Sequence, residues 1–166
     1  NIVKHYCNLR HRLIPYLYSG AYRYYKNGLP LVQPLYYEVP EIYDGTEYKN
    51  EYYFGSELFI APITSKKDLV MNRSVQRTYL PKGTWYDFKT GKKFPGDKRY
   101  VTFYTDEDYP VYAREGSIIP LAILDKNINV TNSPESMEIH VFPGKSNIFK
   151  LYEDDGLSDL YRKGFY

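Results

Sequence analysis

Cysteine is nearly absent from the chain: its 166 residues include one, Cys7. A single cysteine cannot form an intramolecular disulfide, and it excludes zinc sites built from several cysteines. Long apolar runs are also missing, since no stretch approaches the roughly 18 residues that a membrane span needs. Charges of both signs are interspersed, the net charge is +2, and no long basic tract indicates nucleic-acid binding. We therefore expect neither a membrane nor a nucleic acid as a partner.

Residues that would carry catalysis or hold a cofactor are also scarce. His5 and His11 lie six positions apart on an expected helix, which does not place them on one face, and His140 lies in an alternating stretch. No cysteine or carboxylate stands at a metal-binding spacing from these histidines. The sequence has no G-x-S-x-G nucleophile motif and no glycine-rich phosphate loop. We expect no catalytic residue, no metal site and no cofactor in this chain, and the sequence leaves any substrate-binding residues unknown.

Aromatic residues, in contrast, are abundant: 21 Tyr, 8 Phe and one Trp. Tyrosine combines a large apolar ring with a polar tip, so it suits half-wet surfaces as well as cores. This composition predicts extensive β-structure with broad contact faces, either for a sugar or for another domain. The plainer interpretation is that tyrosine replaces phenylalanine and leucine at half-buried positions.

The hydrophobic pattern predicts one helix followed by many short strands. Residues 4–27 carry an apolar stripe near i, i+4 spacing, with a kink expected at Pro15 and a C-terminal cap at Gly28. Two buried strands are expected, at 31–37 and 58–63. Farther along, short alternating stretches bounded by Gly, Pro, Asp or Asn predict a β-sandwich. The expected fold is therefore mainly β, with a helix–strand unit ahead of the sandwich.

The stretch LYEDDG, residues 151–156, places three carboxylates in a row after a run, 147–150, that we expect to begin a strand. Neighbouring strand residues point to opposite faces, so Asp154 and Asp155 cannot both face one sugar ring as a catalytic pair. A calcium loop of the common type would need acidic ligands at alternate positions and a distal glutamate, which the stretch lacks. Asp and Gly are frequent turn residues, and a turn is the favoured interpretation. Calcium binding by another geometry stays an alternative.

A second candidate is the aromatic group in WYDFKTGKKF. Trp85, Tyr86 and Phe88 have the flat faces on which sugar rings stack. Strand alternation, however, sends Trp85 to one side and the other two aromatics to the opposite side, so at least one set packs inside. Structural packing is favoured over sugar binding.

Several blocks of the chain together resemble glycoside hydrolase family 31, the α-glucosidase and α-xylosidase family. Residues 51–63 are similar to the family segment Q-F-M-x-G-x-x-L-L-V-A-P-V, and 79–91 to its Y-L-P-x-G-x-W-Y-D-x-x-T-G hairpin. Further matching blocks occur in order, at 10–40, 109–120 and 151–156. The sequence departs from the family pattern at Gln33, where Arg is usual, and at Tyr53, where Met is usual.

The resemblance implies a C-terminal part of a longer enzyme. It implies that residues 1–57 end a (β/α)₈ catalytic barrel, 58–123 form a proximal C-terminal β-sandwich, and 124–166 start a distal β-domain. The family retains anomeric configuration by means of two aspartates, a nucleophile and an acid/base, carried on earlier barrel strands. Their usual motifs do not occur in this chain, so no catalytic residue can be carried over.

The expected function is that of a supporting fragment of a retaining α-glycosidase, which hydrolyses terminal α-linked glucose or xylose. The carbohydrate substrate would bind the barrel, and that barrel would be the partner of this chain. The alternative is a non-catalytic carbohydrate-binding β-sandwich module. The frequency of Lys, Asn and Tyr is typical of an AT-rich genome, so a bacterial cytoplasmic enzyme is expected, with the endoplasmic reticulum or secretion as alternatives.

Overall fold

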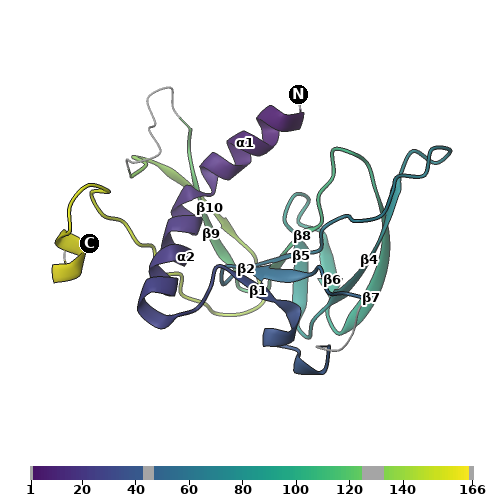
Figure 1. Cartoon of the computed structure of the whole chain (residues 1–166), viewed down its shortest axis with the longest axis horizontal. Coiled ribbons are helices and arrows are strands. Elements are labelled where there is room, and N and C mark those ends of the chain that lie inside the picture. The colour runs from purple at the N-terminus through teal and green to yellow at the C-terminus, as the bar shows by residue number, and fades with distance from the viewer. Residues whose placement is uncertain (1, 43–46, 125–132, 165–166) are drawn as a thin grey trace. The chain divides into compact units, whose positions relative to one another are not determined.

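The computed structural model of the protein describes residues 2–42, 47–124 and 133–164 (Figure 1). The chain divides into two compact units, each built from stretches that are distant in sequence. The helical unit comprises Asn1–Leu31, Ile118–Val141 and Asn147–Tyr166, and the β unit comprises Val32–Ser117 and Phe142–Ser146. Within the described ranges, no helix has the length and apolarity needed to cross a bilayer.

The helical unit begins with two consecutive helices, α1 (Ile2–Arg12) and α2 (Ile14–Asn27). The expectation of a single helix with a kink at Pro15 was wrong, because the break lies at Leu13. Proline lacks an N–H, so it fits the first turn of a helix, where that group has no partner, and α2 therefore starts next to it. The expected cap is confirmed: Gly28 has φ 69° and donates its N–H to Tyr24 O at 2.8 Å.

An antiparallel hairpin, β9 (Ile118–Ala122) and β10 (Met137–Val141), packs its first strand against α2. Residues 125–132, within the expected domain boundary at 124–136, lie outside the described part of the chain. The strand expected from residue 147 was wrong, because residues 147–155 have no regular structure. A 3-10 helix, Leu160–Lys163, follows.

The β unit contains one six-stranded sheet and one two-stranded sheet (Figure 1). The six strands pair antiparallel in the order β1-β2-β3-β8-β5-β6. Their bounds are β1 Val32–Pro34, β2 Tyr52–Phe54, β3 Leu58–Ile60, β8 Val111–Arg114, β5 Thr84–Asp87 and β6 Lys93–Pro95. The other sheet pairs β4 (Ser74–Leu80) with β7 (Lys98–Tyr104). The mainly β fold is confirmed.

Prolines shorten the first strands relative to expectation. The strand expected at 31–37 was wrong in its extent, since β1 ends at Pro34 and the next three residues, Leu35–Tyr37, form a 3-10 helix. Proline has no N–H for a sheet ladder, so pairing stops there. A second 3-10 helix covers Pro40–Ile42. The strand expected at 58–63 ends early, at Ile60, two residues before Pro62.

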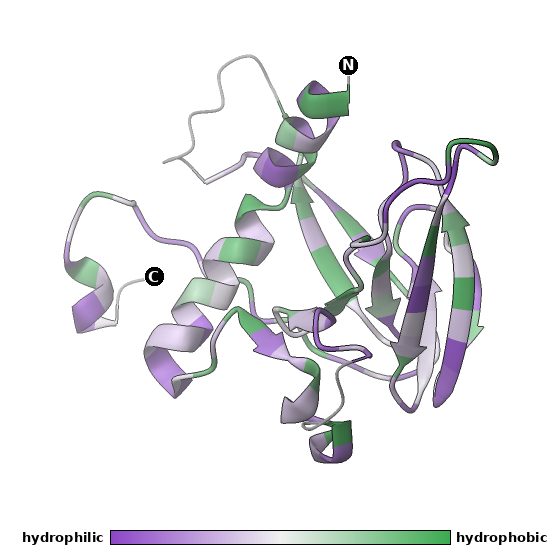
Figure 2. Cartoon of the chain, turned by 45° about the vertical axis from the view of Figure 1, so that its right-hand side comes forward, coloured by the Kyte–Doolittle hydropathy of each residue, from purple (hydrophilic) through white to green (hydrophobic). Residues whose placement is uncertain are grey.

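The core of the β unit is aromatic. Phe59, Trp85 and Tyr112 are each 2% exposed or less. The ring centroids of Phe59 and Trp85 lie 5.4 Å apart, and the indole Nε1 donates to Pro81 O at 2.7 Å. In Figure 2 the strands of this unit show alternating hydrophobic and hydrophilic bands, as half-buried strands do. Because the indole N–H has an acceptor, the large ring can be buried without leaving an unpaired donor. This aromatic cluster forms the core of the unit.

Candidate functional site

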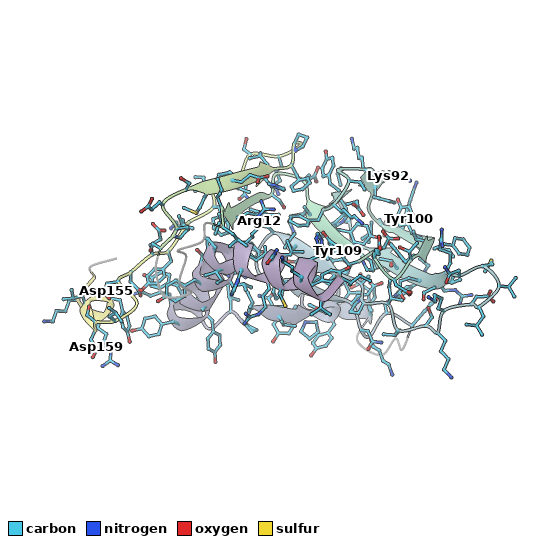
Figure 3. All side chains as sticks on the ribbon, turned by 90° about the horizontal axis from the view of Figure 1, so that it is seen from above. Arg12, Lys92, Tyr100, Tyr109, Asp155 and Asp159 are labelled. Carbon is cyan, nitrogen blue, oxygen red and sulfur yellow. The ribbon has the colours of Figure 1, made fainter. Side chains whose placement is uncertain are left out.

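The acidic stretch of the sequence serves the local fold. Asp154 accepts hydrogen bonds from the Tyr152 hydroxyl at 2.5 Å, the Tyr18 hydroxyl at 2.7 Å and the Gly156 N–H at 2.9 Å. These donors, the Tyr152 hydroxyl first, hold the pKa of the Asp154 carboxyl below its ordinary value. Asp155, on the same C-terminal segment as Asp159 (Figure 3), accepts from the N–H groups of the two residues that follow Gly156. The turn interpretation is confirmed.

The backbone of this segment is fastened to α2. The N–H of Tyr152 donates to the Ser19 hydroxyl at 3.0 Å, and that hydroxyl donates to Pro15 O at 2.8 Å. The Tyr152 ring stacks on Tyr22 with centroids 3.9 Å apart and planes 8° apart. The Asp154 carboxylate raises the pKa of Tyr18 to about 12 through their hydrogen bond. The stretch is therefore a structural staple within the helical unit.

The histidines do not form a cluster in the described structure. His140 Nε2 lies 2.5 Å from Glu138 Oε1, and Arg12 Nη2 lies 2.6 Å from the other oxygen of the same carboxylate. His5 packs edge-on against the neighbouring Tyr6. Across the residues that the structure describes, no three His, Cys, Asp or Glu side chains gather as a metal site would require.

Packing accounts for all three aromatics of the WYDF stretch. Trp85, Tyr86 and Phe88 are buried, and the last two lie against Phe142. Strand alternation predicted that at least one set packs inside, and the structure buries both. An indole that is 2% exposed cannot stack on a sugar ring from solution.

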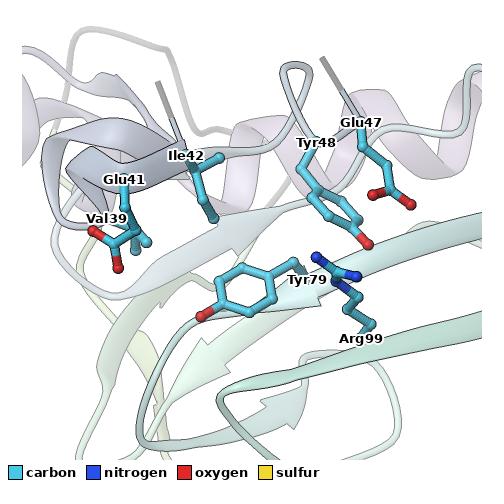
Figure 4. Close-up of a pocket in the computed structure, with 7 residues that line it drawn as sticks. All are labelled: Val39, Glu41, Ile42, Glu47, Tyr48, Tyr79 and Arg99. Atoms are coloured by element: carbon cyan, nitrogen blue, oxygen red, sulfur yellow. The ribbon is translucent and has the colours of Figure 1, made fainter. Parts of the chain in front are cut away.

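A pocket of about 320 Å³ opens in the β unit, and aromatic, charged and aliphatic side chains line it (Figure 4). Tyr48 and Tyr79 form an aromatic pair with centroids 5.9 Å apart. The guanidinium of Arg99 lies 5.8 Å from the centroid of Tyr48. The other lining residues are two carboxylates and two aliphatic side chains, Glu41, Glu47, Val39 and Ile42.

The chemistry of this pocket suits a neutral polar ligand. The lining includes one guanidinium, two carboxylates and two tyrosine hydroxyls, so the walls offer both hydrogen-bond donors and acceptors. Burial raises the pKa of Tyr48 and of Tyr79, so both hydroxyls stay protonated at neutral pH. Among the described lining residues, no serine, threonine, cysteine or lysine that could act as a nucleophile is present.

Sequence reasoning missed both this pocket and Glu51, a buried acid beside it. The pocket joins residues from 39–48, β4 and β7, so no local motif could indicate it. A signal for Glu51 did exist: it stands where the family segment Q-F-M-x-G begins with Gln, a neutral side chain of the same shape.

Comparison with known proteins identifies the family. A family model described as the glycosyl hydrolase family 31 C-terminal domain matches residues 28–119. The chain belongs to glycosyl hydrolase family 31. The resemblance to family 31 is thereby confirmed.

Family 31 relatives match almost the whole chain. An α-xylosidase of Saccharolobus solfataricus is 34% identical, with 99% of this chain and 22% of the relative covered. Alpha-glucosidase 2 of Bacillus thermoamyloliquefaciens is 29% identical, with 99% and 20% covered. The solved structure of a family 31 dextranase of Flavobacterium johnsoniae, complexed with glucose, superimposes with a TM-score of 0.81 at 29% identity, covering 99% of this chain and 20% of the dextranase. The chain thus spans about a fifth of the length of these family 31 enzymes.

Proposed function

We propose that this chain is the C-terminal supporting part of a retaining α-glycosidase that hydrolyses terminal α-linked glucose or xylose. The reaction would pass through a covalent glycosyl–aspartate formed in a (β/α)₈ barrel carried by the rest of the parent enzyme. The proposal is supported by the family match to residues 28–119 and by relatives named α-xylosidase and α-glucosidase. The catalytic motifs of the family do not occur in the sequence of this chain.

The supporting role rests mainly on α1. None of its residues is buried, although it carries Val3, 70% exposed, and Ile2, 43% exposed. A helix of 11 residues is marginal in water without tertiary packing. The upstream part of the catalytic barrel in the parent would supply that packing. We propose that the parent is divided as expected, into 1–57, 58–123 and 124–166. The strands on either side of the first boundary, β2 and β3, pair with each other.

Enzyme assays test this function directly. The 166-residue chain alone should give no hydrolysis of aryl α-glucosides or aryl α-xylosides, whereas the parent should hydrolyse one of them with retention. Deletion of this chain from the parent should lower its thermal stability along with its activity. Turnover by the isolated chain, after purification to constant specific activity, would overturn the proposal.

A second candidate, a carbohydrate-binding module, is favoured by one observation, the pocket in Figure 4. Its tyrosines and its guanidinium offer the aromatic and hydrogen-bonding contacts that a neutral sugar needs. Calorimetry with maltooligosaccharides tests this candidate. Binding that Arg99→Ala abolishes and that the exposed-site control Lys92→Ala preserves would support it, and the absence of heat at millimolar sugar would exclude it.

The compartment remains a proposal as well. We propose the bacterial cytoplasm, on the composition of the sequence. Fractionation of the source cells, followed by immunodetection of the parent enzyme, would separate this location from secretion or the endoplasmic reticulum.

A further inference from the structure

Glu51 is a buried acid with an incomplete set of hydrogen bonds. It directly precedes β2 in the β unit and is 3% exposed. Its Oε1 accepts a hydrogen bond from the N–H of Tyr79 at 3.0 Å. Its Oε2 is buried and has no hydrogen-bond partner among the described residues. A half-satisfied carboxyl in a protein interior requires an explanation.

The Glu51 carboxyl connects two segments of the β unit. Tyr79 belongs to β4, which pairs on one side with β7 in a sheet of only two strands. On the other side, the Tyr79 N–H donates to Glu51 instead of to a further strand. The N–H of Glu51 in turn donates to Tyr48 O at 3.0 Å. Glu51 therefore links the segment 47–54 to the open edge of β4.

The charges around Glu51 disfavour its ionised form. Glu47, on the same segment, carries the same charge sign, and the nearby Tyr48 and Tyr112 have raised pKa values, so their hydroxyls stay neutral. Arg99 of β7 lies over the Tyr48 ring, and no cation forms an ion pair with Glu51 in the described part of the chain. Burial, which is the largest cause, raises the pKa of Glu51 to about 8.

We propose that Glu51 is a protonated, neutral clamp at physiological pH, and that its ionisation releases the segment 47–54 from β4. The clamp spans two walls of the pocket in Figure 4, because Tyr48 lies on the segment and Tyr79 on β4. Ionisation would therefore also loosen the pocket. This inference does not depend on the proposed glycosidase function.

The direction of the pH dependence follows from proton linkage. Below the ordinary glutamate pKa of 4.5, Glu51 is protonated in the closed and in the opened state, and the clamp holds fully. Between that value and about 8 only the closed state holds the proton, so each pH unit favours opening about tenfold. Above about 8 both states are ionised, and the opening equilibrium no longer changes with pH.

Glu51→Gln provides the direct test, because glutamine has the same shape and cannot ionise. We would measure amide exchange of peptides containing Tyr79 in the protein that carries this chain, corrected for the intrinsic rate at each pH. Wild-type protection should fall about tenfold per unit from pH 5 to 8. Glu51→Gln should abolish this slope. Equal slopes in both proteins would overturn the proposal.

Glu57→Gln is the matched control, since Glu57 is a glutamate of the same unit that is 4% exposed and accepts from the Ser56 hydroxyl at 3.1 Å. It should retain the wild-type slope. Infrared difference spectra give an independent readout that needs no stable variant. The wild-type protein should show a protonated carboxylic acid band at pH 7 that is lost by pH 10. The absence of that band at pH 7 would refute the neutral clamp.

Discussion

Phe59, Trp85 and Tyr112 of the β unit are buried to 2% exposure or less, whereas α1 of the helical unit has no buried residue. The β unit is organised around an apolar core of aromatic rings. In the helical unit, two tyrosines, Tyr18 and Tyr152, donate hydrogen bonds to a partly exposed carboxylate, that of Asp154. In the β unit, tyrosine contributes mainly to the core; in the helical unit, Tyr16 is buried while these two tyrosines donate to the carboxylate, which the mixed chemistry of tyrosine allows.

The acids of the two units differ in the same way. Asp154 is partly exposed, accepts three hydrogen bonds and has a lowered pKa. Glu51 is buried, accepts one hydrogen bond and has a raised pKa. A carboxylate that several donors surround is stabilised in its charged form, and one that lacks donors is stabilised in its neutral form. Alkaline pH should therefore weaken the β unit, and acidic pH should weaken the helical unit.

Trp85→Ala should have the largest effect, confined at first to the β unit. It would leave a cavity beside Phe59 and remove the indole hydrogen bond to Pro81 O. We expect the free energy of unfolding to fall by about 3–5 kcal/mol. Urea unfolding followed by near-ultraviolet circular dichroism measures this loss. Val101→Ala, at a side chain that is 61% exposed, serves as control and should change little. A similar loss in both variants would contradict an aromatic core centred on Trp85.

Ser19→Ala should have an intermediate effect, confined to the helical unit. Removal of the hydroxyl leaves the buried N–H of Tyr152 without its acceptor. An unpaired buried donor costs about 1–3 kcal/mol. Amide exchange of the segment 151–156 should accelerate, while exchange in β4 should not change. Ser65→Ala is a control, because the Ser65 hydroxyl donates from an exposed position in the β unit. Unchanged exchange in 151–156 would show that the staple does not depend on Ser19.

Much of the β unit could be predicted from sequence. The alternation in SVQRTYL and the turn at Gly91 indicated β4 and the β5–β6 hairpin, because strand periodicity and turn residues act locally. The errors at Leu13 and at Pro34 have one cause. A proline indicates that a helix or strand is interrupted nearby, but it does not specify the residue at which the regular structure ends. The strand expected from residue 147 failed because Tyr152 bonds to a helix instead of a neighbouring strand.

The candidate site could hardly be predicted from the sequence. LYEDDG drew attention because its acids are adjacent in the sequence, yet their roles follow from Tyr18, which lies more than a hundred positions away. The pocket and Glu51 depend on pairings between segments that no local pattern specifies. Environment, not residue type, decides whether a carboxyl is charged. Only the comparison of Glu51 with the Gln of the family segment could have indicated a neutral acid.

Asp154→Asn should have the smallest effect of the three variants at neutral pH and the clearest dependence on pH. Asparagine keeps one acceptor oxygen but loses the charge that strengthens the bonds from Tyr18 and Tyr152, so we expect a loss of about 1 kcal/mol. Because the pKa of Asp154 is lowered in the folded state, its contribution is complete above the ordinary value of 3.8 and disappears as the pH falls through the lowered pKa. Exchange of 151–156 in the wild type should therefore accelerate in acid and reach the rate of Asp154→Asn. If the rates of the two proteins did not converge as the pH falls, the carboxylate would not be what holds the segment to α2.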